Sequence, residues 1–241
     1  MIIRPALGSL DQLARAHPCR PPPTTSHRHT AQAIKVPQFG RESVVAAIEA
    51  MKQGKVIVVT DDEDRENEGD FIMAAQFATP ETVAKIVRHG SGVICVSVKD
   101  KRLQELELPP MVVNNQDPKQ TAFTVSVDVK AGTTTGISAS DRAATFRALA
   151  DPSSVASDFN RPGHVFPLRP REGGVCERDG HTEAAVDFCR LAGLHEAGVL
   201  CEICNDDGTM ARTPELRALC EQQGLVLTSI ADLIAYIKEG K

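Results

Sequence analysis

The sequence predicts one α/β domain, and three observations carry this prediction. Short apolar runs typical of buried strands alternate with segments whose apolar residues recur at helical spacing, and this alternation begins near Ser43. No internal repeat divides the chain. Its 241 residues are enough to bury a substantial core in one large domain.

The first predicted elements follow in order from apolar spacing and stop signals. Apolar residues at helical spacing predict a helix over 44–51, which Gly54 ends. The β-branched run at 56–60 predicts a buried strand. The segment 82–88 again has its apolar residues at helical spacing, and 92–98 reads as a second buried strand.

The second half continues the same alternation. Apolar and polar residues alternate over 123–129, which predicts a half-buried strand. A Ser/Asp cap opens a predicted helix over 140–149, and apolar spacing predicts another over 181–194. The last predicted elements are a strand over 199–203, a helix over 214–223, a strand over 225–228 and a helix over 230–238.

Composition excludes several classes of function. The formal net charge is −5 and no run rich in Lys or Arg occurs, so we expect no nucleic-acid partner. No apolar stretch reaches the roughly 18 residues that span a bilayer, so we expect no membrane insertion. Seven scattered cysteines without a secretory signal indicate reduced thiols in an intracellular protein. Cys201 and Cys204 form a C-x-x-C pair, but without a second pair we favour buried thiols over a zinc or redox site.

Residues 1–38 differ from the rest of the chain and are predicted to be a disordered N-terminal extension, with the domain over 39–241. They contain three consecutive prolines, five basic residues and one acidic residue, and they lack periodic apolar spacing. The same basic, acid-poor composition also suits an organellar transit segment. We therefore expect a cytoplasmic protein, with an organellar location as the alternative.

A strongly acidic segment, residues 61–70, lies between two apolar runs. Its sequence DDEDRENEGD holds seven carboxylates and one arginine, and the flanking runs predict that it is held in a fixed place. If residues 65–70 are extended, Glu66, Glu68 and Asp70 point to one side, because side chains alternate along a strand. Three convergent oxygen ligands suit Mg²⁺ or Mn²⁺. The alternative is a solvated turn.

Four further segments contain residue types that can carry chemistry. The hydroxyl-rich run 133–142 could bind phosphate or polyol oxygens at a helix start, or could simply be a capped turn. His164 lies in a Pro/Gly-stiffened turn that suits a general acid or base, with a purely structural turn as the alternative. Residues 178–183 open a helix with positive charge and free N–H groups, which suits an anion. Glu202 stands on a predicted buried strand, where a carboxylate is costly unless paired or functional.

Together these segments resemble 3,4-dihydroxy-2-butanone 4-phosphate synthase, an enzyme family of riboflavin biosynthesis. The resemblance covers about residues 41–240 and rests on six motifs in order: DDEDRENEGD, TAFTVSVD, GTTTGISASDR, RPGHVFPL, RDGHTEAAVD and CEICNDDGTMAR. It implies a mixed β-sheet flanked by helices and a homodimer with sites near the subunit interface. It also implies a Mg²⁺-dependent conversion of D-ribulose 5-phosphate to 3,4-dihydroxy-2-butanone 4-phosphate and formate, through an enediolate, loss of water and a rearrangement that excises C4.

The resemblance also implies residue roles. Glu66 and His181 hold the metal ion, and Arg65 and Asp70 contact substrate. Glu202 binds substrate and transfers protons, and His164 matches the family's essential histidine. The segment that surrounds the phosphate consists of Arg178, Asp179, Gly180, His181 and Thr182. Three more residues fall near the site: Glu68, Cys95 and Thr135.

Two rival functions use the same residues. One is a Mg²⁺-dependent phosphotransferase or phosphatase, although the chain lacks a P-loop. The other is a binding protein for a divalent cation or a sugar phosphate. Some members of the family continue into a GTP cyclohydrolase II domain; this sequence ends at Lys241, and we expect a single activity.

Overall fold

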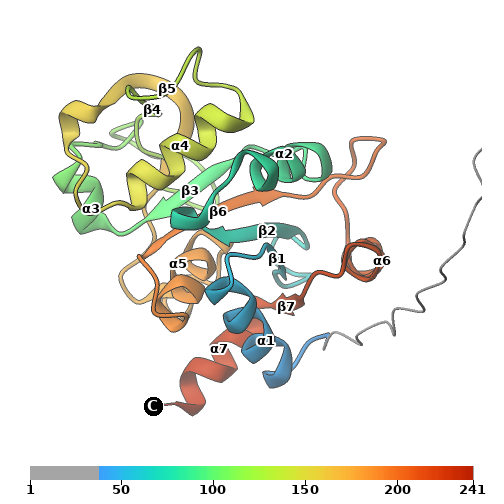
Figure 1. Cartoon of the computed structure of the whole chain (residues 1–241). Coiled ribbons are helices and arrows are strands. Elements are labelled where there is room, and N and C mark those ends of the chain that lie inside the picture. The colour runs from blue at the N-terminus through green and yellow to red at the C-terminus, as the bar shows by residue number, and fades with distance from the viewer. Residues whose placement is uncertain (1–37, 241) are drawn as a thin grey trace, which may run out of the picture. The chain divides into compact units, whose positions relative to one another are not determined.

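The α/β fold predicted from the sequence is confirmed in a computed structural model that describes residues 38–240 (Figure 1). The predicted N-terminal extension lies outside the described residues, apart from Gln38. The strands are β1 (Ile57–Thr60), β2 (Gly69–Ala74), β3 (Cys95–Val98), β4 (Val127–Val129), β5 (Phe159–Leu168), β6 (Ala197–Glu202) and β7 (Leu227–Ser229). The α-helices are α1 (Arg41–Lys52), α2 (Pro80–His89), α3 (Asp100–Glu105), α4 (Ala139–Ala150), α5 (His181–Leu191), α6 (Thr213–Gln223) and α7 (Ile230–Glu239). Three short 3₁₀ turns are η1 (Ala75–Phe77), η2 (Ala156–Asp158) and η3 (Gly174–Cys176).

One seven-stranded mixed sheet organises the domain, with strand order β4-β5-β3-β6-β2-β1-β7. The pairs β1–β7 and β3–β5 are parallel, and the other four neighbouring pairs are antiparallel. Consecutive strands β1 and β2 flank the acidic segment, and the register pairs Thr60 with Gly69. This pairing closes the acidic segment into a loop at one end of the two strands. In the neighbouring pair, Asp70 lies opposite Glu202.

Two hydrophobic cores cover the two faces of the sheet. Helices α1, α5 and α7 pack on one face, where Met51, Phe188 and Leu233 belong to the same cluster as Ile57. Helices α2, α4 and α6 cover the other face, where Phe146 packs in the same cluster as Val58. The alternation of Ile57 and Val58 between the cores follows from the two-residue period of a strand. A strand that is covered on both faces has a continuous run of apolar residues. This explains why residues 56–60 could be predicted as a buried strand.

Several element boundaries differ from the prediction. The helix expected over 181–194 ends at Leu191, and the strand expected over 123–129 is regular only from Val127. The residues 159–168, in which we predicted a stiff turn around His164, form β5. Helix α3 was not predicted. The turn interpretation failed because Pro162 and Gly163 are tolerated here in an irregular part of β5, where the register against β4 shifts between Val127 and Asp128.

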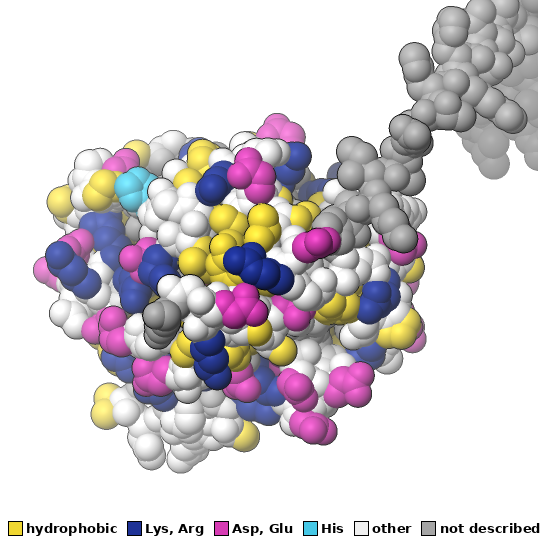
Figure 2. Space-filling model, turned by 90° about the horizontal axis from the view of Figure 1, so that it is seen from below, with side chains coloured by type: hydrophobic (Ala, Val, Ile, Leu, Met, Phe, Trp, Pro, Cys, Tyr) yellow, Lys and Arg dark blue, Asp and Glu magenta, His cyan; other side chains and the backbone are white. Residues whose placement is uncertain are grey.

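Charges of both signs are interspersed on the face that carries α1 and α7. Figure 2 views this face and shows Lys and Arg beside Asp and Glu around a small hydrophobic area. One such pair joins the two helices, with Arg41 Nε 3.2 Å from Glu239 Oε2. Among residues 38–240, no helix is both long and apolar enough to cross a membrane.

Candidate active site

The acidic loop between β1 and β2 is folded around the Asp61 carboxylate. Asp61 Oδ1 accepts the Glu68 N–H at 2.8 Å, and Oδ2 accepts the Glu66 N–H at 3.1 Å. Arg65 Nη1 donates to Asp61 Oδ2 at 2.8 Å and to Glu66 Oε2 at 2.6 Å. A turn occupies residues 63–66, and Asn67 has a left-handed φ of 55°. The extended conformation considered for residues 65–70 is therefore wrong for residues 65–68. The chain forms a strand only from Gly69, where β2 begins.

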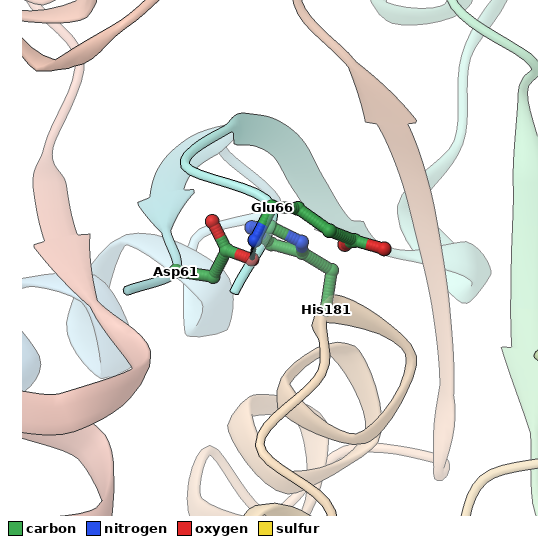
Figure 3. Close-up of side chains that lie close together, drawn as sticks. All are labelled: Asp61, Glu66 and His181. Atoms are coloured by element: carbon green, nitrogen blue, oxygen red, sulfur yellow. Dashed lines mark hydrogen bonds between the residues drawn. The ribbon is translucent and has the colours of Figure 1, made fainter. Parts of the chain in front are cut away.

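This loop brings two carboxylates close to a histidine of α5. Asp61, Glu66 and His181 each offer a ligand atom, and these three atoms lie within 4.8 Å of one another. Figure 3 shows the His181 imidazole extending from the start of α5 toward the loop that carries Asp61 and Glu66. Two carboxylates and one imidazole form a mixed O/N donor set that suits a divalent cation. The guanidinium of Arg65 contacts both carboxylates, so a metal ion would compete with it for their oxygens.

His181 is held in a form that can bind a metal ion. Its Nε2 lies 3.0 Å from the Val59 carbonyl oxygen, which can only accept, so Nε2 carries a proton. Burial lowers the pKa of His181 and outweighs the nearby Asp61 carboxylate, so the ring is held neutral and Nδ1 has a free lone pair. A metal-bound imidazole is commonly oriented by such a bond from its other nitrogen. The donor set and the histidine tautomer therefore fit a bound cation.

Asp70 carries a buried oxygen that no group in the described chain satisfies. Its side chain is 4% exposed, Oδ1 has no hydrogen-bond partner in the described residues, and His181 Nδ1 lies 3.7 Å away, beyond hydrogen-bond distance. Burial raises the pKa of Asp70 well above its usual range, and repulsion from Glu202 adds to the effect. A buried, protonatable carboxyl next to a candidate metal ligand is suited to hydrogen-bonding or proton transfer with a polar ligand.

A small cavity joins these groups to the anion-binding segment. It is lined by Arg65, Glu66, Asp70, Val93, Cys95, Thr121, Phe123, Leu168, Arg178, His181, Thr182, Leu200 and Glu202. Glu202 lies at the end of β6, where Oε2 accepts the Val93 N–H at 3.0 Å. The cavity thus brings together seven of the ten predicted site residues.

The Arg178 guanidinium is held at the cavity by several hydrogen bonds. Its Nη1 donates to Glu183 Oε2 at 2.6 Å, and the side chain of Glu183 is only 1% exposed. Its Nε and Nη2 donate to the Lys119 carbonyl oxygen at 3.2 and 3.1 Å. The Lys119 ammonium in turn donates to the Arg65 carbonyl oxygen at 2.7 Å. Lys119 therefore connects the acidic loop to Arg178.

Three predicted site residues do not line the cavity. Gly180 is the N-cap of α5, and a Cβ there would lie closer than 3.0 Å to Arg178 Nη1 and Glu183 Oε2. Asp179 has a 63% exposed side chain, 3.5 Å from Arg65 Nε. His164 lies on β5, and its Nδ1 is 2.7 Å from Asp128 Oδ2. The cavity includes Cys95 but neither Glu68 nor Thr135.

The sequence interpretation undervalued Asp61 and missed Glu183, Lys119 and Asp128. The sequence interpretation took its convergent ligands from Glu66, Glu68 and Asp70. Asp61 instead organises the loop backbone and also joins the candidate metal cluster. Glu183 belongs to the motif RDGHTEAAVD, where its carboxylate could have been paired with Arg178. Asp128 carries no local signal, because its partner His164 is 36 residues away.

Comparison with known proteins agrees with the geometry. The family model of 3,4-dihydroxy-2-butanone 4-phosphate synthase matches residues 45–236. A chloroplastic bifunctional riboflavin biosynthesis protein of Arabidopsis thaliana is 58% identical over 205 residues, covering 84% of this chain and 38% of that protein. The 3,4-dihydroxy-2-butanone 4-phosphate synthase of Agrobacterium fabrum is 54% identical over 192 residues, covering 80% of this chain and 90% of the relative.

A solved structure is similar over most of the domain. The 3,4-dihydroxy-2-butanone 4-phosphate synthase in complex with two magnesium ions has a TM-score of 0.80 and 47% identity, covering 81% of this chain and 96% of that one. The chain spans about two fifths of the length of the plant riboflavin biosynthesis proteins that it matches. The family match, the relatives and the shared fold agree: this chain belongs to the 3,4-dihydroxy-2-butanone 4-phosphate synthase family.

Proposed function

We propose that this chain converts D-ribulose 5-phosphate to 3,4-dihydroxy-2-butanone 4-phosphate and formate. The observation that carries the proposal is the cavity in which a candidate metal cluster, a fixed arginine and two acidic side chains converge. The reaction proceeds through an enediolate, loses water, rearranges the carbon skeleton, and takes up water again when C4 leaves as formate. Such chemistry needs a cation beside the carbonyl and hydroxyl oxygens and groups that move protons.

We propose Mg²⁺ as the cofactor, with Mn²⁺ as a plausible substitute. A bound ion would supply positive charge beside the substrate oxygens. Glu66 and His181 are the proposed ligands, and Asp61 is a third candidate because its carboxylate lies within reach of the same point. The neutral His181 and the carboxylate pair support this assignment, as does the magnesium complex of the similar solved structure.

The remaining residues are assigned by their place around the cavity. Arg178, with Thr182 at the helix start, binds the dianionic phosphate, where free N–H groups and the helix dipole favour an anion. Arg65 and Asp70 contact the sugar hydroxyls. Glu202, opposite Asp70 across the β2–β6 pair, binds substrate and transfers protons. Asp179 and Gly180 shape the phosphate segment from outside the cavity wall.

A formate assay separates this function from its rivals. Purified protein with ribulose 5-phosphate and Mg²⁺ should release formate, and EDTA should stop the release. Release of inorganic phosphate without formate would favour the phosphatase, and binding of the ion or sugar phosphate without any product would favour the binding protein. Replacement of Mg²⁺ by Mn²⁺ after EDTA treatment tests the second ion.

Four substitutions test the residue roles. Glu66→Ala and His181→Ala should each abolish turnover and weaken Mg²⁺ binding, measured by calorimetry. His164→Ala and Glu202→Ala should lose turnover by about 10²-fold or more, as expected for groups that transfer protons, while the circular dichroism spectrum stays unchanged. Turnover like that of the unmodified chain in either of the last two would contradict its catalytic assignment.

We further propose a homodimer in which His164 serves the site of the partner subunit. His164 does not line the cavity of its own chain, and its side chain is 44% exposed. The exposed apolar residues Met111, Val112, Val113 and Ile137 support an interface on the described chain. The family resemblance implies sites near the subunit interface.

Mixing of inactive subunits tests this arrangement. His164→Ala and Glu202→Ala chains are each expected to be inactive, but mixed dimers would contain one site with both residues intact. Co-refolding the two variants should restore up to about a quarter of the normal activity, since half of the dimers are mixed and each mixed dimer has one intact site. No recovery in dimers that demonstrably exchange subunits would contradict the shared site.

The location of the protein and the boundary of the domain remain proposals. We propose residues 39–241 as the catalytic domain and residues 1–38 as an extension. The composition predicts a cytoplasmic protein with an organellar alternative, and the chloroplastic names of the plant relatives favour the alternative. A fluorescent protein fused to residues 1–38 and expressed in plant cells should enter plastids if the extension is a transit segment. Uniform cytoplasmic fluorescence would favour the cytoplasm.

A further inference from the structure

Two cationic side chains from distant parts of the sequence bind the backbone carbonyls of the acidic loop between β1 and β2. Arg212 Nη1 donates to the Glu66 carbonyl oxygen at 2.9 Å and also to the Asn67 carbonyl oxygen. Lys119 Nζ donates to the preceding carbonyl oxygen, that of Arg65, at 2.7 Å. Three consecutive carbonyl groups of the loop are therefore bound by side chains at least 54 residues away in the sequence.

The backbone of Glu66 is held from both sides. Its N–H donates to Asp61 Oδ2 at 3.1 Å, and its carbonyl oxygen accepts from Arg212. Arg212 is half-buried and does not line the cavity. Within residues 38–240, its guanidinium forms hydrogen bonds only to the two loop carbonyls. A guanidinium presents several N–H donors in a rigid plane, so it can hold two carbonyl groups at once.

The backbone around Arg212 is itself anchored. Arg212 is the N-cap of α6, and its N–H donates to Glu215 Oε2 at 3.0 Å. The Ala211 N–H donates to the Ile203 carbonyl oxygen, and the Ile203 N–H donates to the Gly69 carbonyl oxygen, both at 2.9 Å. The motif CEICNDDGTMAR, which ends at Arg212, is therefore bonded to β2, the strand that follows the acidic loop.

We propose that Arg212 is a positioning residue for the metal site, which fixes the backbone of Glu66 so that its carboxylate stays beside His181 (Figure 3). This inference rests on the proposed function for the role of Glu66 as a metal ligand. The Glu66 carboxylate is paired with Arg65 at 2.6 Å, and it would exchange that partner for the ion. A backbone fixed at both its N–H and its carbonyl lets the side chain change partners while the loop stays in place. A ligand that is already in place binds more tightly, because less ordering is needed on binding.

The direction of one change in affinity separates positioning from a simple charge effect. Arg212 brings a positive charge close to the acidic loop, and a positive charge repels a cation. If only its charge mattered, Arg212→Met should bind a divalent ion more tightly. If Arg212 positions Glu66, the same variant should bind the ion about tenfold or more weakly, as is usual when a group that orients a metal ligand is lost. Methionine retains an unbranched apolar stem, so the variant removes the donors and the charge but little of the packing.

Two measurements on the full chain test the proposal. Mn²⁺ binding is measured by electron paramagnetic resonance, and hydrogen exchange of residues 61–70 is measured by mass spectrometry in EDTA. Arg212→Met should weaken Mn²⁺ binding by about tenfold or more and speed the exchange by about fivefold or more. The Mg²⁺ concentration for half-maximal formate release should rise by about the same factor as the Mn²⁺ dissociation constant, with kcat at saturating Mg²⁺ changed less than about threefold.

Arg217→Met on the same helix is the matched control. The Arg217 guanidinium lies 4.6 Å from the centroid of the Phe39 ring and donates to Gln38, and it makes no hydrogen bond to the acidic loop within the described chain. This variant should leave both Mn²⁺ binding and exchange of residues 61–70 unchanged. Arg212→Lys keeps the charge and one donor group, so we expect an intermediate loss of Mn²⁺ affinity, of about threefold.

Unchanged or tighter Mn²⁺ binding by Arg212→Met would overturn the inference, even if its Tm fell, because Arg212 would then stabilise the fold without positioning the ligand. Absence of Mn²⁺ binding by the unmodified chain would overturn it as well. If Arg212→Met does not fold, Arg212→Lys carries the test, and an affinity equal to that of the unmodified chain would then contradict the inference. Ion binding and exchange are read without turnover. If the unmodified chain made no formate, the proposed function would fail, while these two measurements would still decide the role of Arg212.

Discussion

The surroundings of the Asp70 side chain disfavour its ionised form. It is buried beside Glu202 and the acidic loop, and its Oδ1 has no partner in the described chain. Such a group costs folding free energy unless it binds a proton or a ligand. The same residue lies at the cavity that we propose binds the sugar hydroxyls. The proposed role of Asp70 would therefore exchange stability for function, as is common in active sites.

The variant Asp70→Asn should therefore stabilise the metal-free protein at neutral pH. The pKa of Asp70 is raised in the folded state, so the folded chain retains a proton that the unfolded chain releases. The contribution of this group to stability is present below its ordinary pKa and is lost as pH rises toward the raised value. We expect a higher Tm for Asp70→Asn at pH 7, by about 2–4 °C per kcal/mol gained, and a difference that disappears near pH 4. A lower Tm at pH 7 in EDTA would contradict this account.

Glu183 should affect how Arg178 binds the substrate phosphate, and therefore KM, more than it affects the chemical step. The two side chains form a 2.6 Å ion pair in which Glu183 is 1% exposed, so loss of the carboxylate frees the guanidinium to move. Glu183→Gln should raise KM for ribulose 5-phosphate by roughly tenfold, the equivalent of about 1.4 kcal/mol, with a smaller effect on kcat. Arg190→Gln on the same helix breaks the pair between the half-exposed Arg190 and the buried Asp187, away from the cavity, and serves as the control. Equal KM values in the two variants would contradict a positioning role.

Residues in strong local patterns could be predicted, whereas their partners could not. Two motifs rich in charged residues indicate metal or anion binding from their residue types alone. They contain Glu66, Asp70, Arg178 and His181. Asp128 is one acidic residue on an alternating strand, and only the fold brings it to His164. Side-chain pairs between residues far apart in the sequence cannot be predicted from the spacing of neighbouring residues.

At the scale of elements, the acidic loop shows the limit of a periodicity argument. Alternation is valid only in an extended chain, and Asp61 bonds the backbone of Glu66 and Glu68, which forces a turn instead. The error arose because residues 65–68 were assigned the geometry of β2, which begins only at Gly69. The apolar runs on both sides were nonetheless correct markers of β1 and β2.

The junction of β4 and β5 was obscured by proline and glycine. These residues normally break strands, yet here they mark the irregular segment that places His164 against Asp128. The apolar run at 165–168 was present but was read as part of a turn. Its pairing with β3 is parallel and distant in sequence, so only the folded sheet reveals it.

Gly163→Ala tests the close approach of β4 and β5. The added Cβ would meet backbone atoms of Val127 and Asp128, which cannot rotate away. We expect a loss of about 1–3 kcal/mol in the free energy of unfolding, the usual cost of overpacking, measured by urea denaturation. Gly240→Ala, where the nearest atom is the Tyr236 carbonyl oxygen at 3.8 Å, should change stability by less than about 0.5 kcal/mol. Equal stabilities would argue against a tight junction.

For the whole molecule, the sequence supported the class of fold but not the order of its strands. Alternating strand and helix patterns predicted one α/β domain, because each buried strand needs cover on both faces. The central pairing of β2 with β6 joins segments more than 120 residues apart. That pairing places Asp70 opposite Glu202, so the site depends on a contact that no local pattern contains.

The sheet brings the site together at one place. The loop after β1, the end of β6 and the start of α5 contribute Glu66, Glu202 and His181 to the same cavity. His181 and Glu202 lie at the ends of α5 and β6, and Glu66 lies in the loop between β1 and β2; the bodies of these elements are packed in the two cores. Rigid elements with polar ends can hold reactive groups within the tolerance that catalysis needs.

The central claim is that C4 of ribulose 5-phosphate is released as formate. The most direct test follows that carbon atom into the products. Ribulose 5-phosphate labelled with carbon-13 at C4 would be incubated with the full chain and Mg²⁺, and the products observed by NMR. We predict that the label appears in formate, that the four-carbon phosphate is unlabelled, and that EDTA or Glu66→Ala prevents both. Label retained in the sugar, with or without loss of phosphate, would contradict the proposed reaction.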